Sequence, residues 1–300
     1  TTFPSLAEMR VDPKKVYSFL SISNKQYTKL SVQAFKHLTI EKIQLVANRI
    51  ESLDERVFEK VINLANLDIS YNLLENVSLS NLVNLTYINL NNNELKVIKS
   101  RSFSGLNKIT NLYFSKNRIE EIEMDTFKDQ AKLIDLDLSR NRLKHIKPNL
   151  FATQRSLKTL DLTFNYIDII FRDSFKGLLQ IEELQLKNNL IKVIELGSFN
   201  DFNSFSSSLT LEFQRIKELE PFTFNGVSKV QEISLNYNLL TRIRNQTFAG
   251  INYLSRVELQ FNKISFIESN AFEATIKSIY LSNNQIKNIE NKTFQSATSL

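Results

Sequence analysis

The chain has 300 residues, of which 42% are hydrophobic, and a formal charge of +6 from 38 Lys and Arg against 32 Asp and Glu. This content can bury a long core, but no apolar run reaches the roughly 18 residues of a membrane-spanning helix. The absence of cysteine excludes disulfides, thiol catalysis and cysteine-based zinc sites. Because the basic residues are scattered singly, they favour a solvated surface over a nucleic-acid-binding patch.

From residue 17 onward the chain repeats the pattern LxxLxLxxNxLxxIxxxxFxxL, in which L stands for any apolar residue. The Asn position recurs every 21 to 25 residues, at Lys25, Asn48, Asn72, Asn93, Asn117, Asn141, Asn165, Asn189, Gln214, Asn238, Asn262 and Asn284. Such a period predicts a repeat solenoid. Residues 1–16 would form an N-terminal flank or the remnant of a cap, and 17–300 about twelve repeats, the last of them uncapped.

Each repeat is expected to contribute one short strand. In Leu136-Asp137-Leu138 and its equivalents, apolar residues alternate with polar ones, which is the period of a half-buried strand. Parallel stacking would bury the apolar side of these strands and leave one face of the sheet in water. The Asn carries an acceptor oxygen and a two-donor nitrogen, so it is expected to satisfy backbone groups at the turn leaving the strand.

A second buried column is predicted from Phe residues that recur once per repeat. They are Phe35, Phe58, Phe103, Phe127, Phe151, Phe175, Phe199, Phe224, Phe248, Phe272 and Phe294. Their rings are expected to stack along the outer side at the inter-strand spacing of ~4.8 Å and to fill its wider radius. An aromatic groove for a ligand is the alternative interpretation.

Three repeats depart from the pattern. The repeat between Asn72 and Asn93 has only 21 residues and carries Leu82 in place of Phe. Between Asn200 and Leu209, the usual leucines are replaced by Phe202, Phe205 and the run Ser206-Ser207-Ser208, and the spacing stretches to 25. A shortening at Ala274-Thr275 indicates a tighter outer loop. The stretch at 200–209 is either tolerated slippage of the repeat or a shaped site.

A 24-residue repeat with both the Asn and the Phe columns resembles the typical leucine-rich repeat of animal extracellular proteins, such as Toll-like receptor ectodomains, chaoptin and Slit. The resemblance covers most of the chain. It implies an α/β-type repeat solenoid, a curved horseshoe with a parallel β-sheet on the concave face and mostly loops or short 3-10 segments on the convex face. It also implies secretion or display on a cell surface, and hence an extracellular location.

The ends of the chain differ from those of such ectodomains, which usually carry cysteine-stapled caps. Residues 1–16 contain no cysteine and the last repeat stops at Leu300, so the chain is expected to be a fragment, with any membrane anchor in segments outside it. An uncapped last repeat would expose apolar residues such as Ile279, Leu281, Ile286 and Ile289. Four sequons, at Asn76, Asn84, Asn245 and Asn291, lie outside the core columns and permit N-glycosylation, although chance alone predicts a similar number.

Four positions of the repeat, at −6, −4, −2 and −1 relative to the Asn, are expected to face solvent on the concave side. Over twelve repeats they hold eight acidic and five basic residues, so this face is more acidic than the rest of the chain. The charge argues against nucleic acid and favours a protein or microbial ligand of basic or mixed charge. The densest part is the predicted binding site, formed by Tyr113, Lys116, Asp135, Asp137, Arg140, Asp161, Phe164, Glu183 and Lys187. An ordinary solvated sheet face is the alternative.

Aromatic residues recur at −1, as Tyr71, Phe164, Phe213, Tyr237 and Phe261. They are either interface anchors or residues that pack along the edge of the sheet.

No catalytic constellation is evident. His37 and His145 fall in unrelated repeats at outward positions, and GxSxG, HExxH, P-loop and GxGxxG motifs are absent. Neither a cofactor nor a metal is expected, and Asp135, Asp137 and Asp161 are interpreted as partner contacts rather than as a carboxylate dyad or calcium site. Two functions are left. One is a recognition ectodomain or secreted immune or developmental binding protein; the other is an adhesion or matrix protein acting through homophilic or flank contacts, including a homodimer.

Overall fold

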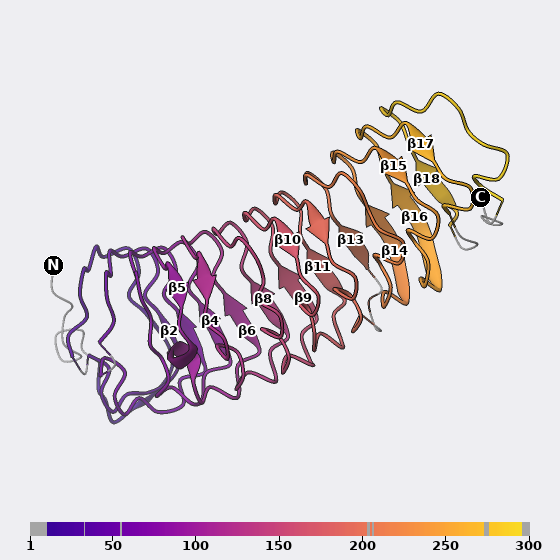
Figure 1. Ribbon diagram of the computed structural model, residues 1–300. Coiled ribbons are helices and arrows are strands. Elements are labelled where there is room, and N and C mark those ends of the chain that lie inside the picture. Colours follow the sequence, from indigo (N-terminus) through magenta and orange to yellow (C-terminus); the bar gives the residue numbers. More distant parts are fainter. Residues whose placement is uncertain are drawn as a thin grey trace. The chain divides into compact units, whose positions relative to one another are not determined.

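The computed structural model describes residues 11–32, 34–54, 56–202, 205, 207–272 and 276–295. Within these ranges no helix is long and apolar enough to cross a membrane. The chain divides into two compact units, where unit 1 is Thr1–Arg142 and unit 2 is Leu143–Leu300. Both consist of short parallel strands joined by turns, which confirms the predicted repeat solenoid (Figure 1).

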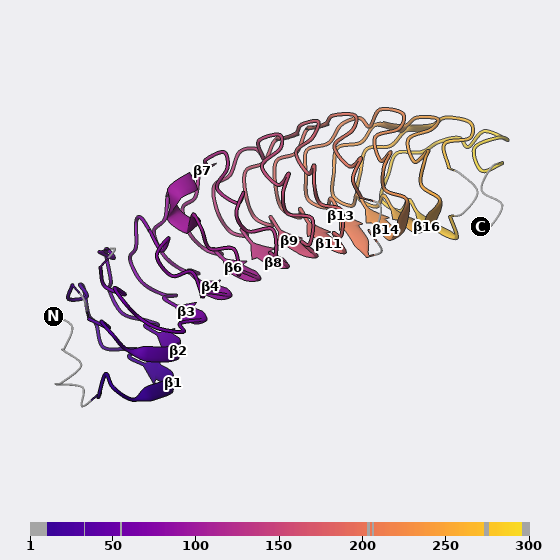
Figure 2. The ribbon, with the colours of Figure 1, turned by 90° about the horizontal axis from the view of Figure 1, so that it is seen from below.

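In unit 1, each strand of the main sheet pairs in parallel with the strand of the next repeat. These strands are β1 (Val16–Ser21), β2 (Thr39–Gln44), β3 (Asn66–Asp68), β4 (Tyr87–Asn89), β6 (Asn111–Tyr113) and β8 (Asp135–Asp137). The outer side carries a small parallel pair, β5 (Val97–Ile98) with β7 (Glu121–Ile122), and the 3-10 helix η1 (Ser100–Phe103). Figure 2 shows the main strands along one side of unit 1 and β7 on the other.

Unit 2 repeats this arrangement. Its main strands are β9 (Thr159–Asp161), β11 (Glu183–Gln185), β13 (Ser208–Thr210), β14 (Lys229–Ser234), β16 (Tyr253–Glu258) and β18 (Ser278–Tyr280), paired in parallel in this order. Two outer pairs accompany them, β10 (Ile169–Ile170) with β12 (Val193–Ile194), and β15 (Arg242–Ile243) with β17 (Phe266–Ile267). The sequence pattern did not predict these outer pairs, because two residues are too few to show an alternation.

The main strands bury every second residue, as their alternation predicts. In β8, Leu136 is fully buried while Asp135 and Asp137 on either side are half-buried. The same order holds in β3, β4, β6, β9, β11 and β13. The central residue of each strand therefore packs in the core, and its two neighbours form an open, polar sheet face.

The Asn column has the structural role that its chemistry predicts. Asn72 Nδ2 donates to Leu45 O of the preceding repeat at 2.9 Å, and its Oδ1 accepts from Ile50 N–H at 3.0 Å. In the longest repeat, Gln214 keeps this chemistry, since its Oε1 accepts from Ile191 N–H at 3.2 Å. These bonds satisfy backbone groups that the stacking of the repeats removes from water.

The Phe column forms the second core, and ten of its members are buried; Phe294 is half-buried. The predicted ring spacing of ~4.8 Å is wrong. Ring centroids of successive members lie 5.4 Å apart in unit 1 (Phe35 and Phe58) and between 5.6 and 6.1 Å apart in unit 2. Because the outer side of a unit is longer than its strand side, the sheet face is the concave face of each unit (Figure 2).

The irregular repeat of unit 2 is filled by aromatic packing. Phe202 and Phe205 are fully buried, and their ring centroids lie 5.4 Å apart. Phe202 also packs against Phe199 and Phe175 at 5.3 and 5.9 Å. In the core these rings replace the regular leucines, which is the outcome expected for a tolerated slippage of the repeat. Ser206 and the shortening at Ala274-Thr275 lie outside the described residues.

Burial weakens in the last described repeat. Ile279, Leu281 and Ile286 are half-buried and Ile289 is 57% exposed, whereas the equivalent residues of inner repeats are buried. Residues 1–10 and 296–300, on which the expected flank and the uncapped end depend, lie outside the described residues.

Candidate binding face

In unit 1 the concave face is built from tyrosines, asparagines and aspartates of neighbouring strands. Tyr113 donates its hydroxyl proton to Asp135 Oδ2 at 2.6 Å and accepts a hydrogen bond from Asn111 Nδ2 at 3.1 Å. The ring of Tyr87 lies 5.4 Å from that of Tyr113. Burial first, and the hydrogen bond to Asp135 second, raise the pKa of the Tyr113 hydroxyl, so this group remains a proton donor at neutral pH.

A serine and asparagine network continues this face toward the turns. Ser115 N–H donates to Asn91 Oδ1 at 2.6 Å, and the Ser115 and Ser139 hydroxyls lie 2.8 Å apart. Asp137 Oδ1 accepts from Ser139 N–H at 2.8 Å. The half-buried polar groups are therefore already ordered, which lowers the entropy lost when a partner binds.

The residue before each Asn marker has a left-handed backbone in every repeat, with φ between 54° and 59°. These residues are Asn24, Ala47, Tyr71, Asn92, Lys116, Arg140, Phe164, Asn188, Phe213, Tyr237, Phe261 and Asn283. This conformation is unfavourable for residues other than Gly, Asn and Asp. The sequence carried a signal for it, because Asn recurs at this position, but the larger side chains there concealed the signal.

In unit 2, three of the aromatics at this position, Phe213, Tyr237 and Phe261, stack on one another. Ring centroids of Phe213 and Tyr237, and of Tyr237 and Phe261, are 4.4 Å apart with nearly parallel planes. Each ring is between 41% and 45% exposed, and the Lys187 ammonium lies 5.2 Å from the Phe213 ring. This geometry shows packing along the edge of the sheet, which is one of the two predicted roles. Because the rings are partly exposed, their edges are also open to a partner.

The concave face of unit 2 is more charged. Lys187 pairs with Glu212 at 2.6 Å, and Arg256 lies 3.5 Å from Glu232 and 3.8 Å from Glu258. Burial first, and the neighbouring Glu258 carboxylate second, raise the pKa of Glu232. Three carboxylates thus share two cations here. The predicted site included only Lys187 of this group, although the others occupy the same columns of the repeat.

The nine residues of the predicted site divide between the units. Five lie on unit 1 (Tyr113, Lys116, Asp135, Asp137 and Arg140) and four on unit 2 (Asp161, Phe164, Glu183 and Lys187). Within unit 2, Asp161 Oδ1 accepts from Thr163 N–H at 2.8 Å, and Glu183 Oε1 accepts from Gln185 Nε2 at 2.6 Å. All nine are at least partly accessible to solvent, and Phe164 is 44% exposed. Tyr87 and Arg256 are face residues that the predicted site omitted.

Titratable side chains do not converge on a chemical centre in the part of the chain that the structure describes. No group of three or more His, Cys, Asp or Glu residues there could hold a metal ion. His37 and His145 are exposed and lie in different units. What the face offers is hydrogen-bonding, charged and aromatic groups over an open surface, the chemistry of a binding scaffold.

Sequence matches give this scaffold its family. Segments 74–119, 108–167, 155–206 and 207–264 match the model described as leucine rich repeat, and residues 17–93 match that of the BspA type leucine rich repeat region. The chain therefore belongs to the leucine-rich repeat family. The animal extracellular type is not established by these matches, because the BspA type is associated with bacteria. No curated protein matches the chain.

Solved structures share the fold at low sequence identity. A leucine-rich-repeat protein of Leptospira interrogans superposes with a TM-score of 0.70 and 21% identity, over 94% of this chain and 71% of that one. A chain of the Drosophila Toll–Spatzle complex gives 0.67 and 18%, over 91% and 45%, so this chain spans less than half of it. A chain of the complex of Latrophilin 3, Unc5D and FLRT2 gives 0.62 and 20%, over 87% and 73%.

Proposed function

We propose that the chain is a non-catalytic recognition module that binds a protein partner through the concave face of its sheet. The observation that carries the proposal is the ordered Tyr113–Asp135 pair, with Asn111 and Tyr87 beside it, on an open strand face. Tyrosine supplies a large contact area at low entropic cost, and the ordered polar groups around it supply directional hydrogen bonds.

The charge of the face favours a basic or mixed-charge partner. Asp135 and Asp137 are half-buried on β8, and unit 2 adds the carboxylates of Glu212, Glu232 and Glu258. Complementary charge would raise the association rate and select against acidic partners, nucleic acid included. Two of the similar solved structures are protein complexes, with Spatzle and with Latrophilin 3 and Unc5D, which supports a protein as the ligand class.

An extracellular location belongs to the same proposal. Its support is the nature of those two complexes and the placement of the sequons, since Asn76, Asn245 and Asn291 are exposed. Asn84 is half-buried, and its Oδ1 accepts a hydrogen bond from Lys108 Nζ at 2.7 Å. Glycosylation is therefore proposed for the three exposed positions in preference to Asn84. Expression through a secretory pathway followed by peptide mapping tests it.

Charge reversal tests the binding face. We expect D135K/D137K to abolish capture of the partner that the wild-type chain enriches from an extracellular fraction, with at least a tenfold loss of affinity for that partner after purification. The matched control is E51K/E75K, which changes the charge equally outside the face. Circular dichroism verifies that both variants fold.

Two outcomes would contradict the proposal. Equal loss in E51K/E75K would mean that net charge, not the face, controls binding. Unchanged capture by D135K/D137K, together with self-association of the wild type in sedimentation, would favour the homophilic adhesion protein instead.

A further inference from the structure

The backbone hydrogen bonding of unit 2 is interrupted beside the outer strand β12. In flanking repeats, the third residue after the Asn column donates to its counterpart in the preceding repeat, as Lys192 N–H does to Asp168 O at 2.8 Å and Thr241 N–H to Lys217 O at 3.2 Å. Among the described residues, no such bond joins Lys217 N–H to Lys192 O, and β12 pairs with β10 alone. The edge of β12 and the facing segment around Lys217 therefore keep main-chain groups that are free to form hydrogen bonds.

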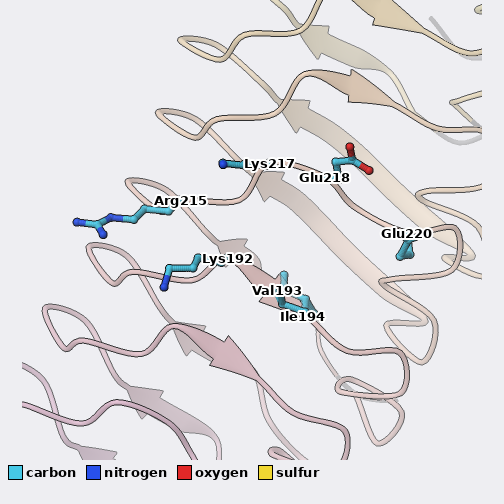
Figure 3. Close-up of a pocket in the computed structure, with 7 residues that line it drawn as sticks. All are labelled: Lys192, Val193, Ile194, Arg215, Lys217, Glu218 and Glu220. Atoms are coloured by element: carbon cyan, nitrogen blue, oxygen red, sulfur yellow. The ribbon is translucent and has the colours of Figure 1, made fainter.

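A cavity of about 360 Å³ lies at this interruption (Figure 3). It is lined by Lys192, Val193, Ile194, Arg215, Lys217, Glu218 and Glu220. This volume is at the lower end of the range of about 300–1,000 Å³ that ligand pockets occupy. The interruption follows Gln214, where the longer side chain replaces the Asn of the regular turn.

Cationic side chains gather on one side of the cavity. Lys192, Arg215 and Lys217 extend together there, away from the glutamates (Figure 3). The Lys192 ammonium lies 3.5 Å from the Asp168 carboxylate. Within the described ranges, Arg215 and Lys217 have no acidic partner. This side of the cavity therefore carries positive charge that the protein itself does not neutralise.

The remaining lining limits what can bind. Glu218 and Glu220 already pair with Arg244, the first at 2.7 Å, and they would repel a densely charged polyanion. Val193, 49% exposed, provides an apolar surface beside the cations. A ligand that matches these groups carries one or two carboxylates, an apolar neighbour, and both donors and acceptors for the free strand edge. An extended peptide has all three.

We propose that this cavity binds an acidic peptide segment, whose main chain pairs with the edge of β12. Its carboxylate contacts Arg215 and Lys217, and an adjacent apolar side chain covers Val193. The site shares no residue with the concave face, so it is a second binding surface that goes beyond the proposed function. Binding here and binding at the concave face can therefore fail independently.

Fluorescence anisotropy with a labelled peptide of alternating glutamate and valine tests the proposal. We expect saturable binding by the intact chain, and no saturable binding of the same peptide with glutamine in place of glutamate. The variant R215A/K217A should weaken binding at least tenfold, because two cationic contacts are lost. The matched control is K263A, since Lys263 directly follows the Asn column as Arg215 follows Gln214 but lies outside the cavity. Its affinity should stay within twofold of wild type.

Three results with the peptide would overturn the proposal. They are the absence of saturable binding at millimolar peptide, equal binding of the glutamine peptide, and unchanged affinity in R215A/K217A. Heparin provides a further arm. If heparin binds more tightly than the peptide and R215A/K217A removes both, the site is a polyanion site and the peptide assignment is wrong. All these substitutions are at exposed side chains, and circular dichroism establishes that the variants are folded.

Discussion

In unit 1 the residues that follow the Asn column pair from one repeat to the next, as Glu75 with Lys96, Glu94 with Arg118 and Glu120 with Arg142. Unit 2 pairs Lys192 with Asp168 in the same way, but its equivalent Arg215 and Lys217 stand beside a cavity, without an acidic partner in the described residues. Their backbones follow the same repeat. Within the described residues, the backbone bond that is missing between Lys217 and Lys192 is also missing between Lys96 and Glu75, so the contrast lies in the exposed side chains. A repeat thus dictates its buried columns and leaves its flank free to acquire a site.

The largest expected effect on stability tests whether the core beneath the interruption at β12 is well packed. Phe202 is fully buried against Phe175, Phe199 and Phe205. F202A should lower the free energy of unfolding by about 3–5 kcal/mol, since it leaves a cavity in a packed core. F202L, which restores the aliphatic residue of Leu178 and Leu106 at this position, should cost less than about 2 kcal/mol.

Urea denaturation measures both variants. If F202A were as mild as F202L, the core at this repeat would be loosely packed, and the interruption beside β12 would be one sign of a generally disordered repeat rather than a shaped site.

The sequence predicted what burial enforces and little else. The columns of Asn72 and Phe103 were found because a misplaced residue there would leave a backbone group unpaired or a core unfilled. The sequence analysis did not predict the left-handed backbone at Lys116 and Phe164. Residues of these types prefer a negative φ, and tertiary contacts hold them in the left-handed region. The cavity beside β12 is lined mostly by exposed side chains of two repeats, and the repeat does not dictate the residue types at these exposed positions.

A smaller effect tests the paired flank of unit 1 against that of unit 2. Arg118 Nε lies 2.5 Å from Glu94, whose side chain is only 26% exposed. R118A should therefore lower the free energy of unfolding by about 0.5–1 kcal/mol at low salt, whereas R215A should change it by less than about 0.3 kcal/mol. Raising the salt concentration should shrink the first difference. If R215A destabilised the chain as much as R118A, Arg215 would have a structural partner and the contrast between the flanks would fail.

The smallest expected effect concerns the concave faces. In unit 1 Asp135 accepts a hydrogen bond from Tyr113, whereas in unit 2 burial and Glu258 raise the pKa of Glu232 above its ordinary value of 4.5. The neutral form of Glu232 is thus favoured by folding, and this stabilisation is complete below the unfolded pKa and is lost as the pH rises through the folded one. E232Q should raise Tm by less than about 2 °C at pH 7 and leave it unchanged near pH 4.

Differential scanning calorimetry at the two pH values, with E51Q as the control outside the face, measures this difference. Arg256 also lies 3.8 Å from Glu258, so we expect that the loss of its contact with Glu232 does not leave it unpaired. A lower Tm for E232Q at pH 7 would mean that the Glu232–Arg256 pair outweighs the burial of the carboxylate. The unit 2 face would then be an ordered ion-pair network comparable to the hydrogen-bonded face of unit 1, and its carboxylates would be less available to a basic partner.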